Sequence, residues 1–341
     1  MRALMMNNKK TLVYGVCIAS VLGLTACGGS GSDSVTVEGD VPIAYVGRAN
    51  TVPMNPTDAG EFRSGGNLYV REKSSPSSTE YNITAQVTAG QGDVSRPEVS
   101  YDGKKIVFAM RCSANTPCSG GSSALAQQDL TWSIWEYDFS KAARLDQGTL
   151  RRVMSLADAR RGDDYDPAYL PGGNGFVFTS RIQDKSSAKS GSAPLYPGQP
   201  GYIALDEYER EGVANLHTMN VDGTKIQQIS FNQSHDRSPT VLQNGRIMYA
   251  RWDHVAGRNH FSIFTVKPDG TDMFVFYGAH SAGNSRLHPR EMQDGKVVTD
   301  QMPLSGTQEG GALMLLDVLN YSEQNTPAND NVPQRRPATG H

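Results

Sequence analysis

The sequence predicts an all-β protein, a β-propeller built from four-stranded antiparallel blades. Two observations lead to this prediction. Short runs of β-branched and aromatic residues alternate with Asp-Gly and Asn-Gly turns, whose residues tolerate the positive φ that tight hairpins need. The same unit of turn and strand then recurs every ~50 to 70 residues, the spacing expected of radially repeated sheets.

The recurring unit is a strand that follows a tight turn, with a proline upstream of that turn. The strands of this kind are Ile106–Ala109, Phe176–Thr179, Ile247–Ala250 and Val297–Thr299. The upstream dipeptides are Arg96-Pro97, Asp166-Pro167, Ser238-Pro239 and His288-Pro289. The strands are apolar without alternation, which is typical of strands covered on both faces. The large aromatic residues that we expect in the packing between blades are Trp132, Trp135, Phe176 and Phe178.

Five blades can be followed along residues 41–320. Their expected ranges are 41–90 (with strands at Pro42–Val46, Asn67–Val70 and Ile83–Val87), Val94–Met154, Asp164–Ser230, His235–His280, and a fifth that begins at Leu287 and includes Ala312–Val318. The tail 321–341 has no apolar periodicity and is expected to be disordered or to end a truncated chain. Either the ring closes with five blades or it is incomplete. We favour an incomplete ring, because proper closure is what hides the strand edges of a propeller.

Several segments resemble known propeller families. Pro97–Ala109 and Leu216–Ile226 resemble the blade repeat of TolB-type propellers, which usually have six blades. Gln228–Asp236, Arg251–His254 and Tyr277–Ser281 resemble bacterial lipoproteins related to the middle domain of the hydrazine synthase alpha subunit. The resemblance covers residues 41–320 and implies the fold; it says little about activity, because propellers host many unrelated functions.

Residues 1–26 have the pattern of a lipoprotein signal peptide. A basic start is followed by Thr11–Ala26, which carries no charge, and the stretch ends in a lipobox, Leu24-Thr25-Ala26-Cys27. Cys27 is therefore expected to be diacylated and to become the new N-terminus. A transmembrane anchor is the alternative, but the uncharged stretch is short for a span. Gly28 in place of an aspartate favours the outer membrane, with the protein facing the periplasm or the cell surface.

The mature chain would be acidic and tethered. Residues 27–40 are rich in Gly and Ser, which suits a flexible tether. Loss of the leader removes three positive charges and takes the net charge from −3 to −6. No basic stripe remains, so nucleic acid is not an expected partner. The expected partners are the membrane, through the lipid anchor, and a periplasmic protein or small ligand.

Cysteine usage bears on both stability and cofactors. Cys112 and Cys118 lie in one polar loop, and an oxidising periplasm would let them form a disulfide; metal ligation is the alternative. No Cys-x-x-Cys-His motif occurs, so no covalently bound haem is expected. No other cofactor is expected, and hydrazine synthesis by this chain alone is not expected.

Strand parity sorts the connections onto two faces of the predicted disc. In a four-stranded antiparallel blade, the tight turns join the first to the second strand and the third to the fourth, so they share one face. The longer connections share the opposite face. These are residues 111–131, 182–213, 232–238, 252–260 and 279–286. Most of the chain's histidines lie on or beside this long-connection face.

The candidate ligand site is the mouth of the central channel on the long-connection face. Its histidines are His235, His254, His260, His280 and His288, and its carboxylates are Asp166, Asp236 and Asp253. The residues expected just before each innermost strand are Arg96, Asp166, Arg237 and His288. Such a group could bind a metal or an anionic ligand. The alternative is that these residues cap loop backbone groups, since none of them has helical metal-ligand spacing.

Two functions follow from these patterns. The first is a binding or scaffold module anchored to the membrane. The second is the non-haem propeller portion of a hydrazine-synthase-like or metal-dependent enzyme subunit, whose catalytic domain is missing from this chain. No nucleophile elbow, His-Glu-x-x-His motif or phosphate-binding loop occurs, which favours a protein that is not itself an enzyme.

Overall fold

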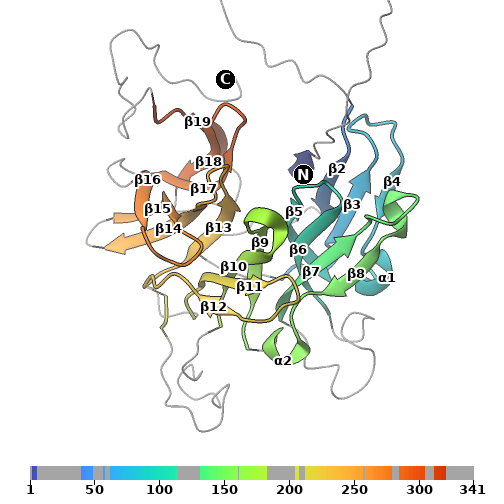
Figure 1. Cartoon of the computed structure of the whole chain (residues 1–341), viewed down its shortest axis with the longest axis horizontal. Helices are drawn as coiled ribbons and strands as arrows, with labels where there is room; N and C mark the ends of the chain where they lie inside the picture. The colour runs from blue at the N-terminus through green and yellow to red at the C-terminus, as the bar shows by residue number, and fades with distance from the viewer. Residues whose placement is uncertain are drawn as a thin grey trace, which may run out of the picture.

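The protein folds into five antiparallel sheets arranged around a common centre (Figure 1). The computed structural model describes residues 2–5, 40–48, 57, 62–113, 131–159, 161–182, 204–206, 212–255, 258–278, 284–303 and 311–319. Four of the sheets have four strands, and the fifth has three among these residues. The prediction of an all-β propeller with five blades is confirmed.

In each sheet the strands follow one another in sequence order from the centre outward. The first two blades contain β1 (Arg2–Met5), β2 (Ile43–Gly47), β3 (Asn67–Arg71) and β4 (Glu80–Asn82), then β5 (Asp93–Val99), β6 (Lys105–Arg111), β7 (Trp132–Asp138) and β8 (Thr149–Arg152). The third contains β9 (Asp164–Tyr169), β10 (Gly175–Ser180), β11 (Asn215–Asn220) and β12 (Gln227–Gln228). The fourth contains β13 (Asp236–Val241), β14 (Ile247–Val255), β15 (Arg258–Val266) and β16 (Phe274–Tyr277), and the fifth β17 (Asn284–Glu291), β18 (Val297–Pro303) and β19 (Ala312–Leu316).

In the described part of the chain, the helices are short and lie between strands. They are α1 (Ala85–Thr88), the 3-10 turns η3 (Leu145–Gln147) and η4 (Pro171–Gly173), and α2 (Leu156–Ala159). Among the described residues, none of the helices has the length and apolar character needed to cross a membrane.

Three details of the sequence-based assignment differ from the structure. The strand expected at Ile83–Val87 is instead a bend followed by the first three residues of α1. The Thr84 hydroxyl accepts the Leu68 N–H at 2.9 Å, in place of a backbone carbonyl from a neighbouring strand. The loop expected at 252–260 consists largely of the paired ends of β14 and β15. Strand β1, which pairs with β2, falls within the range expected to be a leader and was not predicted as a strand.

Each hydrophobic core lies between two neighbouring blades. The β6 strand shows why: Ile106 and Phe108 pack with Leu68 of the first blade, whereas Val107 packs with Phe176 of the third. Both faces of such a strand are buried, which explains its unbroken apolar run. The expected placement of the large aromatic residues is confirmed, since Trp132, Trp135, Phe176 and Phe178 all lie in these inter-blade cores.

Most connections between the described strands sort by length as strand parity predicts, but residues 6–42 separate β1 from β2, and only residues 256–257 separate β14 from β15. The tight turns, which include residues 100–104 and 242–246, join first to second strands, and 221–226 and 267–273 join third to fourth strands. The connections 112–131 and 181–214 leave the opposite edge of their sheets. The disc therefore has a tight-turn face and a long-connection face.

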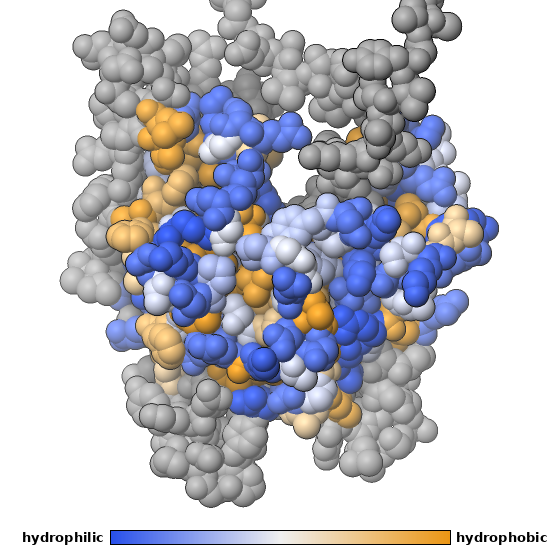
Figure 2. Space-filling view, in the orientation of Figure 1, coloured by the Kyte–Doolittle hydropathy of each residue, from blue (hydrophilic) through white to orange (hydrophobic). Residues whose placement is uncertain are grey.

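The first and fifth sheets flank an opening in the ring. Figure 1 places β17–β19 on one side and β1–β4 on the other, and Figure 2 shows open space between their described residues in the same view. Each of these sheets therefore has one face with no neighbouring blade among the described parts of the chain.

One tight turn is also a contact between blades. Gly223, at φ 79°, lies in the turn between β11 and β12, and an added Cβ there would lie 2.2 Å from the carbonyl oxygen of Val153 in the second blade. Gly295, at φ 80° in the turn between β17 and β18, has no atom within 4 Å of that position.

We predict that Gly223→Ala destabilises the protein much more than Gly295→Ala does. Both substitutions incur about 1 kcal/mol because a Cβ is strained in the left-handed region. Gly223→Ala must also displace the second blade, at a further cost of about 1–3 kcal/mol. Urea unfolding of the two variants measures the difference, and equal losses would contradict this blade contact.

Candidate functional site

Every described innermost strand from the second blade to the fifth breaks its pairing at the same place. The residue before the proline adopts a left-handed conformation: φ is 54° at Arg96, 48° at Asp166, 55° at Ser238 and 55° at His288. The strand register shifts at each of these points. Because proline has no N–H to donate to the ladder, a bulge is the expected result. We call these four positions the bulge residues.

The bulge residues correct two details of the predicted site. They lie inside the innermost strands, not just before them. The fourth-blade member of the set is Ser238, not Arg237, because Ser238 has the left-handed backbone and precedes Pro239. Aligning the four repeats on their prolines identifies Ser238 as the fourth bulge residue. Arg237 was chosen only because it is charged.

Asp166 links the innermost strands of three blades. Its carboxylate lies 3.2 Å from Nε of Arg96 in the second blade and 3.7 Å from Nε of Arg237 in the fourth. It also accepts the backbone N–H of Ser238 at 2.9 Å. The side chain is 3% exposed, so two guanidinium groups and a backbone donor compensate for its burial. Three predicted site residues are therefore brought together, in an arrangement that fastens blades.

The fifth blade has its own polar contacts toward the centre. His288 Nδ1 lies 2.7 Å from Oδ2 of Asp300, across the pair β17–β18. Arg290 of β17 forms an ion pair of 2.7 Å with Glu98 of β5, which connects the fifth blade directly to the second. Neither Asp300 nor the pair Arg290–Glu98 was predicted from the sequence.

A second charged group lies near the long-connection face, at the start of β13. Asp236 is fully buried beside Arg251, at 3.7 Å, and accepts a hydrogen bond from Asn232 at 3.2 Å. Arg251 also lies 3.8 Å from Asp253. Burial raises the pKa of Asp236 to about 6, although Arg251 opposes the shift. This group holds a carboxylate that titrates well above its usual range.

His235 performs a structural task that recurs around the ring. Its Nδ1 accepts the backbone N–H of Ala214, which precedes the third strand of the preceding blade, at 3.1 Å. Asp163 accepts the N–H of Trp132 in the same way at 2.9 Å, and Ser285 that of Phe261 at 3.1 Å. All three acceptors stand four residues before the bulge proline. We call this contact the inter-blade staple; sequence reasoning missed it because Asp, His and Ser share only an acceptor atom.

The other predicted site residues lie apart from one another. His254 stacks on Trp252 with the ring planes 6° apart, and His260 Nε2 lies 3.0 Å from the carbonyl oxygen of Gly278. Cys112 is buried after β6. The predicted residues that lie outside the described part of the chain are Cys27, Cys118 and His280. Within the described part, no group of three or more potential metal ligands is assembled.

The chain resembles known proteins in its three-dimensional structure. No family model matches the chain, and no curated protein matches it in sequence. Hydrazine synthase of Kuenenia stuttgartiensis superposes with a TM-score of 0.59 at 15% identity, over 81% of this chain and 37% of its own. The chain shares its β-propeller fold with this protein. Two TolB structures align less closely: Agrobacterium tumefaciens (TM-score 0.47, 12% identity, 77% and 74% covered) and Acinetobacter baumannii (0.41, 16%, 80% and 53%). The propeller thus spans little over a third of the hydrazine synthase chain.

We predict that His235→Ala destabilises the fold and that His235→Asn largely restores it. The alanine leaves the buried N–H of Ala214 without its acceptor, which costs about 1–3 kcal/mol. The asparagine carbonyl occupies nearly the position of Nδ1 and can accept the same bond. Chemical unfolding of both variants checks this. If asparagine were no better than alanine, the staple would not be the role of His235.

We predict that Asp236 makes the protein less stable as the pH rises from about 4 to 6. Its folded-state pKa exceeds the ordinary aspartate pKa of 3.8, so the native state binds more protons in this window and the free energy of unfolding falls with rising pH. A shift of about two units corresponds to roughly 3 kcal/mol. Asp236→Asn, which mimics the protonated acid, should flatten this part of the stability curve.

The matched control is Asp222→Asn at the exposed turn before β12. Hydrogen bonds from Thr224 lower the pKa of Asp222, so its contribution has the opposite sign. This variant should keep the wild-type fall in stability between about pH 4 and 6. Parallel curves for wild type and Asp236→Asn, measured by urea unfolding, would contradict the assignment.

Proposed function

We propose that this protein is an outer-membrane lipoprotein whose propeller serves as a binding or scaffold module. Cleavage before Cys27 removes β1 and leaves β2, β3 and β4 in the first blade. Diacylated Cys27 then anchors the protein, residues 27–40 tether it, and the long-connection face meets a periplasmic protein or a small ligand. The observation that carries the proposal is the placement of two long connections, 112–131 in the second blade and 181–214 in the third, which leave their sheets at the edge opposite the tight turns. Long connections on a rigid scaffold are where binding residues concentrate.

The chemistry of the centre supports binding in preference to catalysis. Asp166 is compensated by two arginines and Glu98 by Arg290, so these charges are used between blades. His235, a fully buried member of the predicted ligand set, is committed to the inter-blade staple. Charges already satisfied within the fold are poor general acids or bases.

The long-connection face has a further feature that suits an oxidising compartment. Cys112 directly follows the second strand of the second blade, at the start of the 112–131 connection. We propose that it pairs with Cys118 and shortens the free length of this connection. A closed small loop loses less entropy on binding a partner than an open one.

A second candidate function is the propeller portion of a larger enzyme. The observation in its favour is the superposition on hydrazine synthase at a TM-score of 0.59. In that role the propeller would position a catalytic partner through the same face. Stoichiometric metal in the purified chain would favour this candidate, and metal content by mass spectrometry measures it.

We predict that the long-connection face, and not the tight-turn face, contacts a partner in cells. A photo-crosslinking residue at Asp253, near the end of β14 on the long-connection face, should give a discrete adduct in the outer-membrane fraction. The matched position is Asp294, in the tight turn between β17 and β18, which should give none. Gel mobility and mass spectrometry of the adducts provide the readout.

The anchor is tested in the same experiment. Cys27→Ser should release the protein from the outer-membrane fraction, because a single lost lipidation site removes both acyl chains. Equal adducts at Asp253 and Asp294 would count against the binding face. An unchanged membrane fraction for Cys27→Ser would count against the anchor alone.

A further inference from the structure

The open side of the first blade carries side chains that elsewhere in the ring are covered by another blade. Tyr45 and Tyr69 are cross-strand partners on β2 and β3. Their neighbours Ala44 and Leu68 pack toward the second blade. Because successive side chains of a strand point to opposite faces, the two tyrosines lie on the face turned away from the second blade, toward the opening of the ring.

Internal comparison shows that this face differs from its counterpart in the second blade. There, the paired aromatic residues are Phe108 and Trp135, which the first blade buries. Two residues further along β7, the second blade pairs buried Tyr137 with Leu150, which is partly buried against the same hydrophobic core. The first blade pairs Arg71 with Glu80 at the corresponding position. An ion pair in place of two core residues suits contact with water or a polar ligand, and is costly against another blade.

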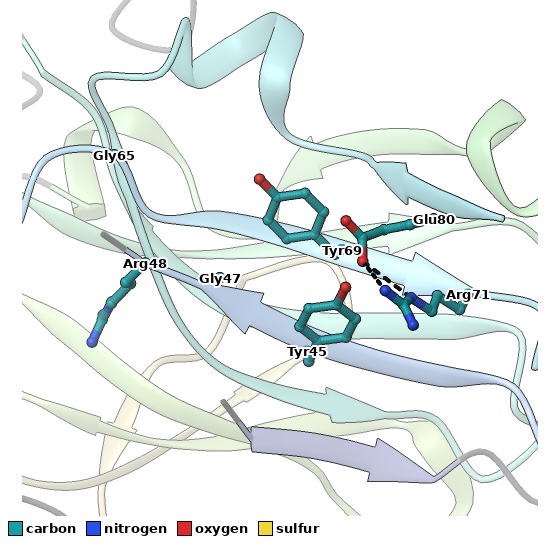
Figure 3. Close-up of a pocket in the computed structure, with 7 residues that line it drawn as sticks. All are labelled: Tyr45, Gly47, Arg48, Gly65, Tyr69, Arg71 and Glu80. Carbon is teal, nitrogen blue, oxygen red and sulfur yellow. Dashed lines mark hydrogen bonds and ion pairs between the residues drawn. The ribbon is translucent and has the colours of Figure 1, made fainter. Parts of the chain in front are cut away.

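The four side chains form a fixed surface (Figure 3). The Tyr45 and Tyr69 rings stack with centroids 5.6 Å apart and planes at 16°. Gly47 makes this possible, because a Cβ there would lie 2.7 Å from Cε2 of Tyr69. The Arg71 guanidinium lies 5.7 Å from the Tyr45 ring centre and donates to Oε2 of Glu80 from Nε and Nη2, at 3.0 and 2.6 Å. The aromatic rings and the charged pair therefore stand side by side.

These residues line a hollow of about 350 Å³, together with Gly65 and Arg48. This volume is at the small end of ligand pockets in proteins. Arg71 is balanced by Glu80, and Arg48 by Asp93 at 2.8 Å, so the lining carries no excess charge. A charged ligand would have to displace one of these ion pairs, whereas a neutral ligand leaves them intact.

We propose that this hollow on the first blade binds a neutral sugar, one or two pyranose rings in size. The apolar C–H face of a pyranose fits a flat tyrosine surface, and Tyr69, which is only half-buried, offers it. Both bonds from Arg71 end on Oε2 of Glu80, so Oε1 is the oxygen placed to accept from sugar hydroxyls. The site is separate from the long-connection face and goes beyond the proposed function.

The test is a titration of the full chain with two neutral disaccharides, cellobiose and N,N′-diacetylchitobiose, and with digalacturonate as the acidic comparison. Saturation-transfer NMR should show contact between tyrosine protons and at least one neutral disaccharide, with a dissociation constant of about 1 mM. Tyr69→Ala should weaken this binding by about 10-fold or more, and Tyr69→Phe by less than about 3-fold, because phenylalanine keeps the ring face.

Two further variants keep the test decisive. Glu80→Ala should also weaken binding, because it removes the carboxylate that accepts hydrogen bonds from the sugar hydroxyls. Glu80 is exposed on β4, so this variant serves as the test if Tyr69→Ala does not fold. Phe274→Ala, at an exposed position on β16, should leave binding unchanged. The proposal is overturned if the folded protein shows no saturable binding of either neutral disaccharide up to about 20 mM. Binding unaffected by both Tyr69→Ala and Glu80→Ala, or a tenfold preference for digalacturonate, would also overturn it.

Discussion

The burial of each sheet between two neighbours is the constraint on which the rest of this structure depends. Among the residues that the structure describes, four hydrophobic cores lie between blades, and each draws side chains from two sheets. A blade removed from the ring would expose both apolar faces, so the sheets are stable only as an assembly. Burial of apolar surface has no preferred geometry, whereas the polar contacts between blades require a defined orientation of the two sheets. The inter-blade staples place the third strand of one blade against the first strand of the next, and thereby set the angle between sheets.

At the centre of the ring, buried charged side chains form ion pairs between neighbouring blades. Each proline breaks an innermost strand, and the bulge turns the preceding side chain out of the regular alternation. At Asp166 this brings a carboxylate between arginines of two other blades. The charges that looked like a ligand site in the sequence thus act between elements of the fold. The two surfaces that we propose for recognition, the long-connection face and the open side of the first blade, are not occupied by this packing.

The open side of the first blade differs in composition from the corresponding face of the second blade. The first and second blades share strand order and register, and their paired aromatic positions correspond. Where the second blade meets a neighbour, the pair Tyr137–Leu150 is apolar; where the first blade meets none among the described residues, Arg71 and Glu80 form an ion pair. The composition of each face follows what covers it, because a buried ion pair is costly and an exposed apolar face invites aggregation.

The all-β class, the five blades and the tight-turn face could be predicted without coordinates, since Asp-Gly and Asn-Gly turns and unbroken apolar runs are local signals. The sequence also marked Arg96, Asp166 and His288 through their prolines, yet it misplaced the fourth member, since charge made Arg237 more conspicuous than Ser238. Tertiary structure alone decided the partners: His235 with Ala214, Asp166 with Arg96, and Glu98 with Arg290. These pairs are separated by 21 to 192 residues, and only the curvature of the ring brings them within bonding distance.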